Sequence, residues 1–527
     1  MRGSLFCGGM LLAAAAALAW LGAADARIAA LLRNTLQLSG GVALVALPVG
    51  VALGWLVART DLPGRRTTFA LLAALLFLPL YVQAAAWDAG FGLQGSLTRQ
   101  FLGGEVWLNG MPAVIWIHAL AAMPWAALCV ALGVSGVERE LEEQALLEMP
   151  AWQVALRVSL RRAAPAIGLA LVGIVLTTAT ETTVTDLFRV RTFAEELFTM
   201  QQLGDDRGLR TVVLASLVAI TWLVMLALVI GAALATVVRA RRPNSSRVFS
   251  LGRFRWPSWL VVTVVLLFAV GAPVACLAFK AGLIVEMQGA MRVRHWSATG
   301  AAVTTWRSVY RFREELGWSC AAATIAACAA VACAAPLAWI ARRGGWRGWA
   351  TGVAAVAMLA TPGSLLAMGL IRTLSQPDAS GLLWLRDQPL SCLVLVQWWR
   401  AFPWALGILW FALRTVPEAQ LDVAMLDGLG AYSRFGRIGL AQHRGALAAA
   451  WTVAFTIAIG ELPASVLVAP PGVVTLPIQV FNQLHYGAEK EVAGICLAVV
   501  LMQTGLVMAV LWPRIHHGEH GMGRREK

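Results

Sequence analysis

The sequence is short of charge. Only 13% of its 527 residues are Asp, Glu, Lys or Arg, whereas 59% are hydrophobic. Soluble domains carry about 25% charged residues, so this chain cannot cover the surface of a soluble 56.2 kDa protein with polar side chains. The composition therefore excludes a soluble enzyme, a disordered protein and a fibrous repeat, and it predicts a protein that crosses the membrane many times.

Lysine and the usual catalytic motifs are also scarce. The three lysines are Lys280, Lys490 and Lys527, and none follows a glycine, which excludes the Gly-Lys-Ser/Thr phosphate loop of an ATPase. The eight cysteines form no CxxC pair, and we expect them to be small apolar residues rather than metal ligands. No HExxH or Ser-His-Asp arrangement is present. We therefore expect no catalytic residues, no cofactor and no metal site.

Long continuous apolar stretches are what the chain has instead. A helix that crosses about 30 Å of hydrocarbon needs roughly 20 apolar residues, and continuous rather than alternating runs favour helices over barrel strands. The sequence thus predicts an all-α, polytopic membrane protein with about twelve spans. They lie near residues 5–24, 36–58, 68–88, 111–134, 166–185, 210–237, 258–280, 317–341, 348–372, 389–413, 445–469 and 492–512.

The first of these stretches has a second interpretation. Arg2, the apolar run and Ala24-Asp25-Ala26 also resemble a secretory signal with a small-residue cleavage site. Both alternatives leave the second span starting outside.

The basic residues predict an orientation. If the N-terminus lies inside, 25 of the 42 Lys and Arg residues fall on inside segments and 16 on outside segments. This bias favours cytoplasmic termini, although the outside segment 281–316 is itself basic. The positive charge is then a topology signal, and a nucleic-acid partner is not expected because no basic stripe lies on a soluble domain.

The chain repeats its plan at an offset of 280 residues. Arg157 precedes Glu181 by 24 positions, and Arg437 precedes Glu461 by the same 24. Further matching landmarks are Ala58-Arg59 with Ala341-Arg342, Pro79 with Pro362, and Met123-Pro124-Trp125 with Phe402-Pro403-Trp404. We predict two six-span halves in the same orientation. Residues 1–240 form the first half, 241–257 a cytoplasmic linker, 258–515 the second half and 516–527 a cytoplasmic tail.

Two inside loops are unusually long and occupy matching places: the first loop, residues 135–165, and the second loop, residues 414–444. Each reads as a short amphipathic helix, a break and another short helix. The breaks are Met149-Pro150 and Gly428-Leu429-Gly430. A solvated connector is one interpretation, but two copies at equivalent positions favour docking to a partner.

The second loop resembles the EAA loop of ABC importer permeases, in which E-A-A, three residues, G, nine residues and I-x-L-P follow one another. This chain has Asp422-Val423-Ala424, Gly428 and Ile438-Gly439-Leu440-Ala441 at that spacing. The first loop keeps the spacing with Glu142-Glu143-Gln144 but has Glu148 where glycine belongs. Over nearly its whole length the chain resembles a fused double permease, similar to the type I permeases that import ferric iron or thiamine.

The resemblance implies a transport subunit of the bacterial inner membrane. It implies that each loop docks on a separate ABC ATPase subunit, that the ATPases form a dimer, and that a periplasmic or extracellular solute-binding protein delivers the cargo. The residues that it places at the docking loops are Glu142, Ala145, Glu148, Pro150, Asp422, Ala424, Asp427 and Gly428. Ferric iron is the expected cargo, with thiamine, a polyamine or another small solute as alternatives.

Glu181 and Glu461 each end an apolar stretch, where an ionisable group is costly and therefore a candidate for the transport pathway. Carboxylate oxygens would suit a hard cation such as Fe³⁺. The alternative is that each carboxylate caps a helix or pairs with an arginine. The rival function is a secondary transporter driven by an ion gradient, which would explain the spans but not the paired loops.

Overall fold

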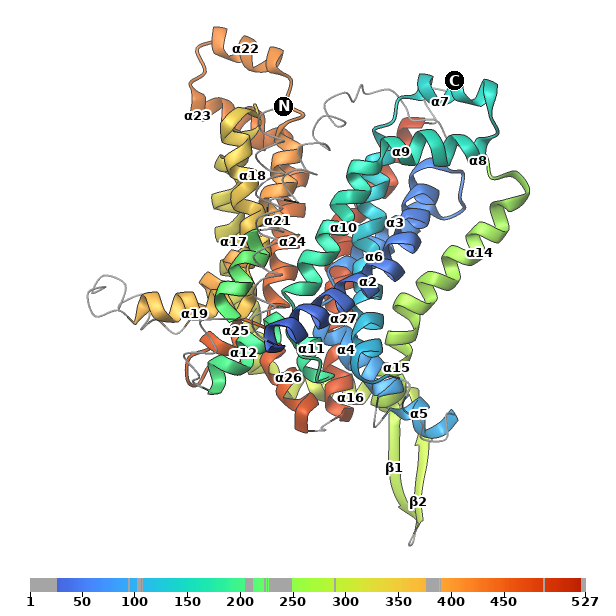
Figure 1. Cartoon of the computed structure of the whole chain (residues 1–527), viewed down its shortest axis with the longest axis vertical. Coiled ribbons are helices and arrows are strands. Elements are labelled where there is room, and N and C mark those ends of the chain that lie inside the picture. The colour runs from blue at the N-terminus through green and yellow to red at the C-terminus, as the bar shows by residue number, and fades with distance from the viewer. Residues whose placement is uncertain are drawn as a thin grey trace. The chain divides into compact units, whose positions relative to one another are not determined.

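The computed structural model describes residues 26–92, 95–101, 106, 108–203, 212–221, 224, 226, 249–288, 291–375, 388, 390–486 and 489–522. Within that part of the chain almost every element is a helix, and one hairpin of two antiparallel strands is present (Figure 1). Six helices are long and apolar enough to cross a membrane, and nine spans result if three sharply bent helix pairs each count as one. The predicted all-α, polytopic membrane fold is confirmed.

The predicted spans that are missing from this number have simple explanations. The stretch 5–24 and most of 210–237 lie outside the described residues. The predicted span 445–469 contains a helix of only 16 residues, Arg444–Ile459, which is shorter than the roughly 20 residues that a straight crossing requires.

The chain divides into two compact units. Residues 1–310 and 483–504 form the first, and residues 311–482 and 505–527 the second. The helices that follow the predicted linker, α14 (Arg255–Leu266) and α15 (Ala272–Gly282), pack on α3 (Arg65–Leu76) and α4 (Leu80–Phe91). Packing thus groups this span with the first unit. The two halves at 1–240 and 258–515 describe the sequence repeat and stay a prediction.

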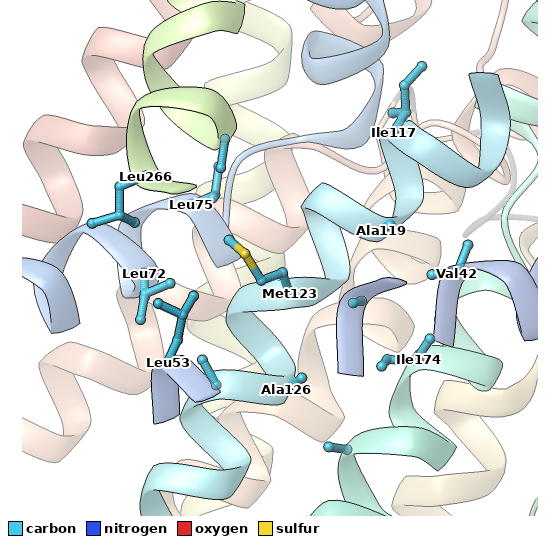
Figure 2. Packing of buried hydrophobic residues seen from close by; sticks show 14 of the residues in the cluster. Val42, Leu53, Leu72, Leu75, Ile117, Ala119, Met123, Ala126, Ile174 and Leu266 are labelled. Carbon is cyan, nitrogen blue, oxygen red and sulfur yellow. The ribbon is translucent and has the colours of Figure 1, made fainter. Parts of the chain in front are cut away.

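The first unit is built around α2 (Ala26–Arg59), α6 (Gly110–Ser135) and α10 (Ala164–Ala179). Small residues bring these helices close together, since a Cβ atom on Gly50 would lie 2.4 Å from the Cβ of Ala126, and one on Gly54 would lie 2.4 Å from the carbonyl oxygen of Ala127. Such close approach is the usual packing mode of helices in lipid. Figure 2 shows the apolar core that results, with Leu53, Met123 and Ile174 among its buried side chains.

The remaining elements of the first unit connect these helices. They are α5 (Ser96–Phe101), α7 (Arg139–Glu148), α8 (Ala151–Val154), η1 (Ala155–Ser159), α9 (Leu160–Arg162), α11 (Thr183–Leu187), α12 (Phe193–Leu203), η2 (Gly252–Phe254), η3 (Leu267–Gly271), β1 (Leu283–Gln288), β2 (Met291–Trp296) and α16 (Ala298–Arg311). The strands pair in register from Leu283 with Trp296 to Gln288 with Met291. Helix α27 (Glu489–Met522) contributes its first part to this unit.

The second unit repeats the plan. Its core helices are α17 (Arg313–Ala341), α21 (Ser391–Leu413) and α24 (Arg444–Ile459). An alanine stripe along α17, including Ala323, Ala327, Ala330 and Ala334, is completely buried. The other elements are α18 (Gly345–Ala360), α19 (Gly363–Leu374), α22 (Glu418–Leu426), α23 (Ala431–Arg434), η4 (Phe435–Leu440), α25 (Ser465–Val468) and α26 (Leu476–Tyr486).

Matching bends support the repeat that the sequence shows. The chain bends by 97° between Arg65–Leu76 and Leu80–Thr98, and by 100° between α18 and α19. The N-cap residue after each bend is the predicted landmark proline, Pro79 in one unit and Pro362 in the other. A proline at this place cannot continue the preceding helix, because it lacks the N–H and clashes with the turn before it. Helices α10 and α24 also begin and end at positions that are 280 residues apart.

Candidate functional site

Both long loops fold as the sequence predicts. In the first loop α7 is followed by a break and then by α8, η1 and α9; in the second, α22 is followed by a break and then by α23 and η4. The segments η1 and η4 are π-helical and begin at Ala155 and Phe435, which are again 280 residues apart. Short π-helical segments inside helices are frequent at functional sites.

The breaks use different residues to reach similar geometry. Gly428 adopts φ +78°, a left-handed conformation that favours glycine. Two positions later Gly430 has φ −64° and ψ 166°, close to the φ −66° and ψ 154° of Pro150 in the first loop. Glu148, which occupies the place of the glycine in the first loop, is followed by the extended residue Met149. The loss of the glycine is thus accommodated by an extended residue and a proline.

The first loop is tied to the end of span α2 by a buried ion pair. The guanidinium of Arg59 donates a hydrogen bond to Oε2 of Glu142, and neither side chain is exposed. Ser159 Oγ donates to the other carboxylate oxygen of Glu142 at 2.7 Å. One carboxylate therefore joins α2, α7 and η1, and this clamp (Arg59, Glu142 and Ser159) fixes the loop to the membrane-spanning helices.

The linker that precedes α14 reaches the same place. The backbone N–H of Phe249 donates to the carbonyl of Arg59 at 2.7 Å, and the N–H of Leu251 donates to Asp61 Oδ1 at 2.8 Å. The ring of Phe249 also lies 6.0 Å from the guanidinium carbon of Arg59. The described end of the predicted linker therefore lies on the same side of the first unit as the first loop.

The second loop lacks a buried clamp of this kind at the matching positions. The guanidinium carbon of Arg342 lies 3.9 Å from the centre of the Trp339 ring, and its Nη2 lies 3.8 Å from Oε1 of Glu418, a side chain that is half exposed. Burial lowers the pKa of the Arg342 guanidinium, and Glu418 acts against this shift. Gly439, the counterpart of Ser159, leaves room for Trp339, since a Cβ there would lie 2.7 Å from that ring. Stacking on the Trp339 ring and a pairing with the exposed Glu418 thus take the place of the buried ion pair.

The predicted docking residues divide into buried and exposed groups. Glu142 and Ala424 are buried, and the carbonyls of Ala145 and Ala424 accept hydrogen bonds that close the helix ends. Exposed members are Glu148, Pro150, Asp422, Asp427 and Gly428. The sequence did not single out Arg59 and Ser159 as site residues. The repeated Ala58-Arg59 landmark was the available signal for the first of them.

Large apolar side chains stand out on both loops. Leu147 is 88% exposed and Trp152 62% in the first loop, while Leu426 is 84% exposed and Tyr432 92% in the second. Trp152 and Tyr432 occupy equivalent positions at the offset of 280. Beside α7 a groove of about 570 Å³ is lined by Gln144, Glu148, Met149, Arg157, Arg161 and other residues. Exposed apolar side chains beside such a groove are typical of a protein-binding surface.

Glu181 and Glu461 both cap the turn that follows their span. Glu181 accepts hydrogen bonds from the N–H groups of Thr183 at 2.6 Å and Val184 at 3.0 Å. Glu461 accepts from the N–H groups of Ala464 and Ser465, both at 2.9 Å, and from the Ser465 hydroxyl. The helix-cap alternative thus describes their contacts, and a contact with cargo stays a prediction.

The turn at Glu181 has a histidine as its neighbour. Nε2 of His118 lies 3.4 Å from Oε2 of Glu181, and its Nδ1 lies 2.8 Å from the Val114 carbonyl. Counting from the matched prolines Pro124 and Pro403, the counterpart of His118 is Gln397, which is also buried. Each repeat therefore buries a polar side chain on the helix before its loop.

Comparison with known proteins finds similarity over a limited stretch of the chain. No protein-family model matches the chain. A stretch of 99 residues is 29% identical to the putrescine transport system permease protein PotI of Escherichia coli strain K12, and equally to PotI of Escherichia coli O6:H1 strain CFT073. The match covers 19% of this chain, which thus spans about a third (34%) of the length of these relatives. Part of the chain is thus distantly similar to a transport permease, in agreement with its apolar spans.

Proposed function

We propose that this chain is the transmembrane permease subunit of an ABC importer and that it couples to separate ATPase subunits through its two long loops. The observation that carries the proposal is the repeated helix–break–helix, with a π-helical segment at the same offset in both copies. The sequence match to a transport permease supports it independently. A secondary transporter driven by an ion gradient would not require these loops.

The loops offer surfaces for two ATPase subunits. Leu147 and Trp152 on the first loop, and Leu426 and Tyr432 on the second, expose apolar area that a partner would cover. Trp and Tyr are enriched among the residues that carry most of the binding energy at protein interfaces. A binding protein on the opposite side of the bacterial inner membrane, which the family resemblance implies, is part of the same proposal.

The cargo that the comparison favours is a polyamine. The matched relatives are named for putrescine transport, which supports the polyamine alternative and gives no support to ferric iron or thiamine. A polyamine is cationic, so carboxylates such as Glu181 and Glu461 would suit it electrostatically as well as they would suit Fe³⁺.

Reconstitution tests the proposal. The chain is purified from native membranes together with any bound ATPase, and it is placed in vesicles with a candidate binding protein and labelled putrescine, ferric iron or thiamine. We expect a bound ATPase and uptake that requires ATP. Uptake by the chain alone, driven by a proton or sodium gradient, would establish the secondary transporter instead.

A variant pair locates the docking surface. Leu147→Ser combined with Leu426→Ser should reduce ATPase capture at least tenfold while leaving membrane insertion unchanged, because both side chains are exposed. Ala419→Ser, at another exposed position on α22, is the control and should retain capture. Equal capture by the double variant and the control would show that the ATPase does not dock on these apolar side chains.

A further inference from the structure

The basic segment 281–316 is left unexplained by the transport proposal. Five of the sixteen basic residues that are predicted to lie outside fall in this segment. Membrane proteins usually concentrate Lys and Arg in their cytoplasmic loops instead. The segment folds as the β1–β2 hairpin followed by α16, at the end of the first unit remote from α7 (Figure 1). Helix α16 is amphipathic, and Ser308 is its one buried side chain among the described residues.

Three points fix α16 at the boundary of the bilayer. Its start is held by the N–H of Ser297, which donates at 3.0 Å to the carbonyl of Gly282, the last residue of the span Gly252–Gly282. Its middle packs on Gly494, the fifth residue of the span Lys490–Ala509 and hence about 6 Å inside it. Its end is followed, after Phe312, by the span that begins at Arg313. All three spans begin or end where α16 lies.

The face toward α27 approaches that helix closely at Gly494. A Cβ atom on Gly494 would lie 2.7 Å from Ser308 Oγ and 3.2 Å from the Thr304 carbonyl oxygen. Ser308 is only 2% exposed. Because residues 304 and 308 are one turn apart, this contact fixes the rotation of α16 about its own axis.

The opposite face is apolar and exposed. Trp306 is 75% exposed, Tyr310 66% and Val303 47%, and at 100° per residue they lie on the side of the helix away from Ser308. Arg307 and Arg311, both exposed and one turn apart, flank this stripe. Trp and Tyr are enriched at the level of lipid headgroups, and arginine side chains extend to the phosphate layer from such helices.

We infer that α16 is an interfacial helix whose Val303–Trp306–Tyr310 face inserts into the lipid of the leaflet remote from the first loop. Arg307 and Arg311 bind the phosphate groups of anionic phospholipids there. The positive charge of this segment then serves lipid binding rather than topology. The inference does not depend on which solute is transported or on whether an ATPase is bound.

Spin labels test the insertion. Cysteine is placed at Val303, Trp306 or Tyr310 of the full chain after its eight native cysteines are replaced by alanine, and the protein is reconstituted in nanodiscs of phosphatidylglycerol and phosphatidylethanolamine. We expect the ratio of oxygen to nickel-chelate accessibility to be several-fold higher at these positions than at a label on Tyr432, an exposed loop position. Ratios equal to that at Tyr432 would overturn the inference and leave an aqueous surface.

Native mass spectrometry tests the headgroup contact on the chain with its native cysteines. Arg307→Gln with Arg311→Gln should lower retention of phosphatidylglycerol relative to phosphatidylcholine several-fold. Arg307→Lys with Arg311→Lys keeps the charge and should stay within twofold of the unaltered chain. Undiminished retention by the glutamine variant would overturn the role of the two arginines.

Discussion

Arg59 is the residue on which the first loop depends most. Its guanidinium and the Glu142 carboxylate are both fully buried, so Arg59→Ala leaves a carboxylate in the interior without its counter-charge. Removing one partner of a buried pair costs about 3–5 kcal/mol. We expect a clearly lower thermal midpoint of the purified chain, and faster cleavage within residues 138–163 under limited proteolysis.

Arg343 provides the matched comparison. It pairs with Glu418 at 3.2 Å, but both side chains are more than half exposed, and exposed pairs contribute roughly 0–1 kcal/mol. Arg343→Ala should therefore barely change the midpoint. If Arg59→Ala and Arg343→Ala have the same thermal midpoint, the clamp does not hold the first loop.

In the second loop, Gly428 is the residue on which the break between the two short helices depends most. Its φ of +78° is unfavourable for residues with a Cβ, by about 1–2 kcal/mol, yet a Cβ there would meet no atom within 4 Å. Gly428→Val should thus distort the break without a steric clash, reducing ATP-coupled uptake strongly while the chain still inserts in the membrane. Gly428→Asn is the control, because asparagine tolerates the left-handed region. Normal uptake by the valine variant would contradict a docking role for this break.

At the scale of elements, local patterns predicted much of the structure. The amphipathic helices α7 and α22, their breaks, and the bends at Pro79 and Pro362 follow from periodicity and from proline chemistry over a few residues. The clamp could not be predicted in this way, because Arg59 and Glu142 are 83 positions apart and meet only through the packing of α2 on α6. The alternative that Glu181 caps a helix was open for the same reason, since hydropathy does not specify hydrogen-bond partners.

The start of α23, where Gly430 is the N-cap residue, can be tested with a substitution that should stabilise the chain. Gly430 already has a backbone conformation close to that of Pro150, so Gly430→Pro transfers the cap of the first loop to the second. Restricting the unfolded chain at a compatible site stabilises a protein by roughly 0.4–1 kcal/mol. We expect a slightly higher thermal midpoint and unchanged ATPase capture. A lower midpoint would mean that Leu429 cannot adopt the extended conformation that must precede a proline.

At the scale of the whole molecule, hydropathy predicted where the membrane lies but not how the spans are grouped. The span 258–280 follows the predicted linker, yet its helices pack on α3 and α4 in the first unit. Apolar surface is equally suited to lipid and to another helix, so composition cannot assign a span to its neighbours. Small residues such as Gly50 and Gly54, which decide close approach, are visible in the sequence, whereas their partners are not.

The orientation of the molecule supplies the last prediction. The first unit places Arg59, Glu142 and Phe249 at one end of its spans and the start of α16 after the span that ends at Gly282. With the arginine-rich end in the cytoplasm, Arg294→Cys, at an exposed position of β2, should react with a membrane-impermeant maleimide in spheroplasts. Tyr432→Cys should react only after the membrane is permeabilised. The unsubstituted chain, whose described cysteines lie mainly in apolar helices, gives the background. Labelling of Tyr432→Cys in intact spheroplasts, with Arg294→Cys protected, would reverse the topology and place the loops where no cytoplasmic ATPase can reach them.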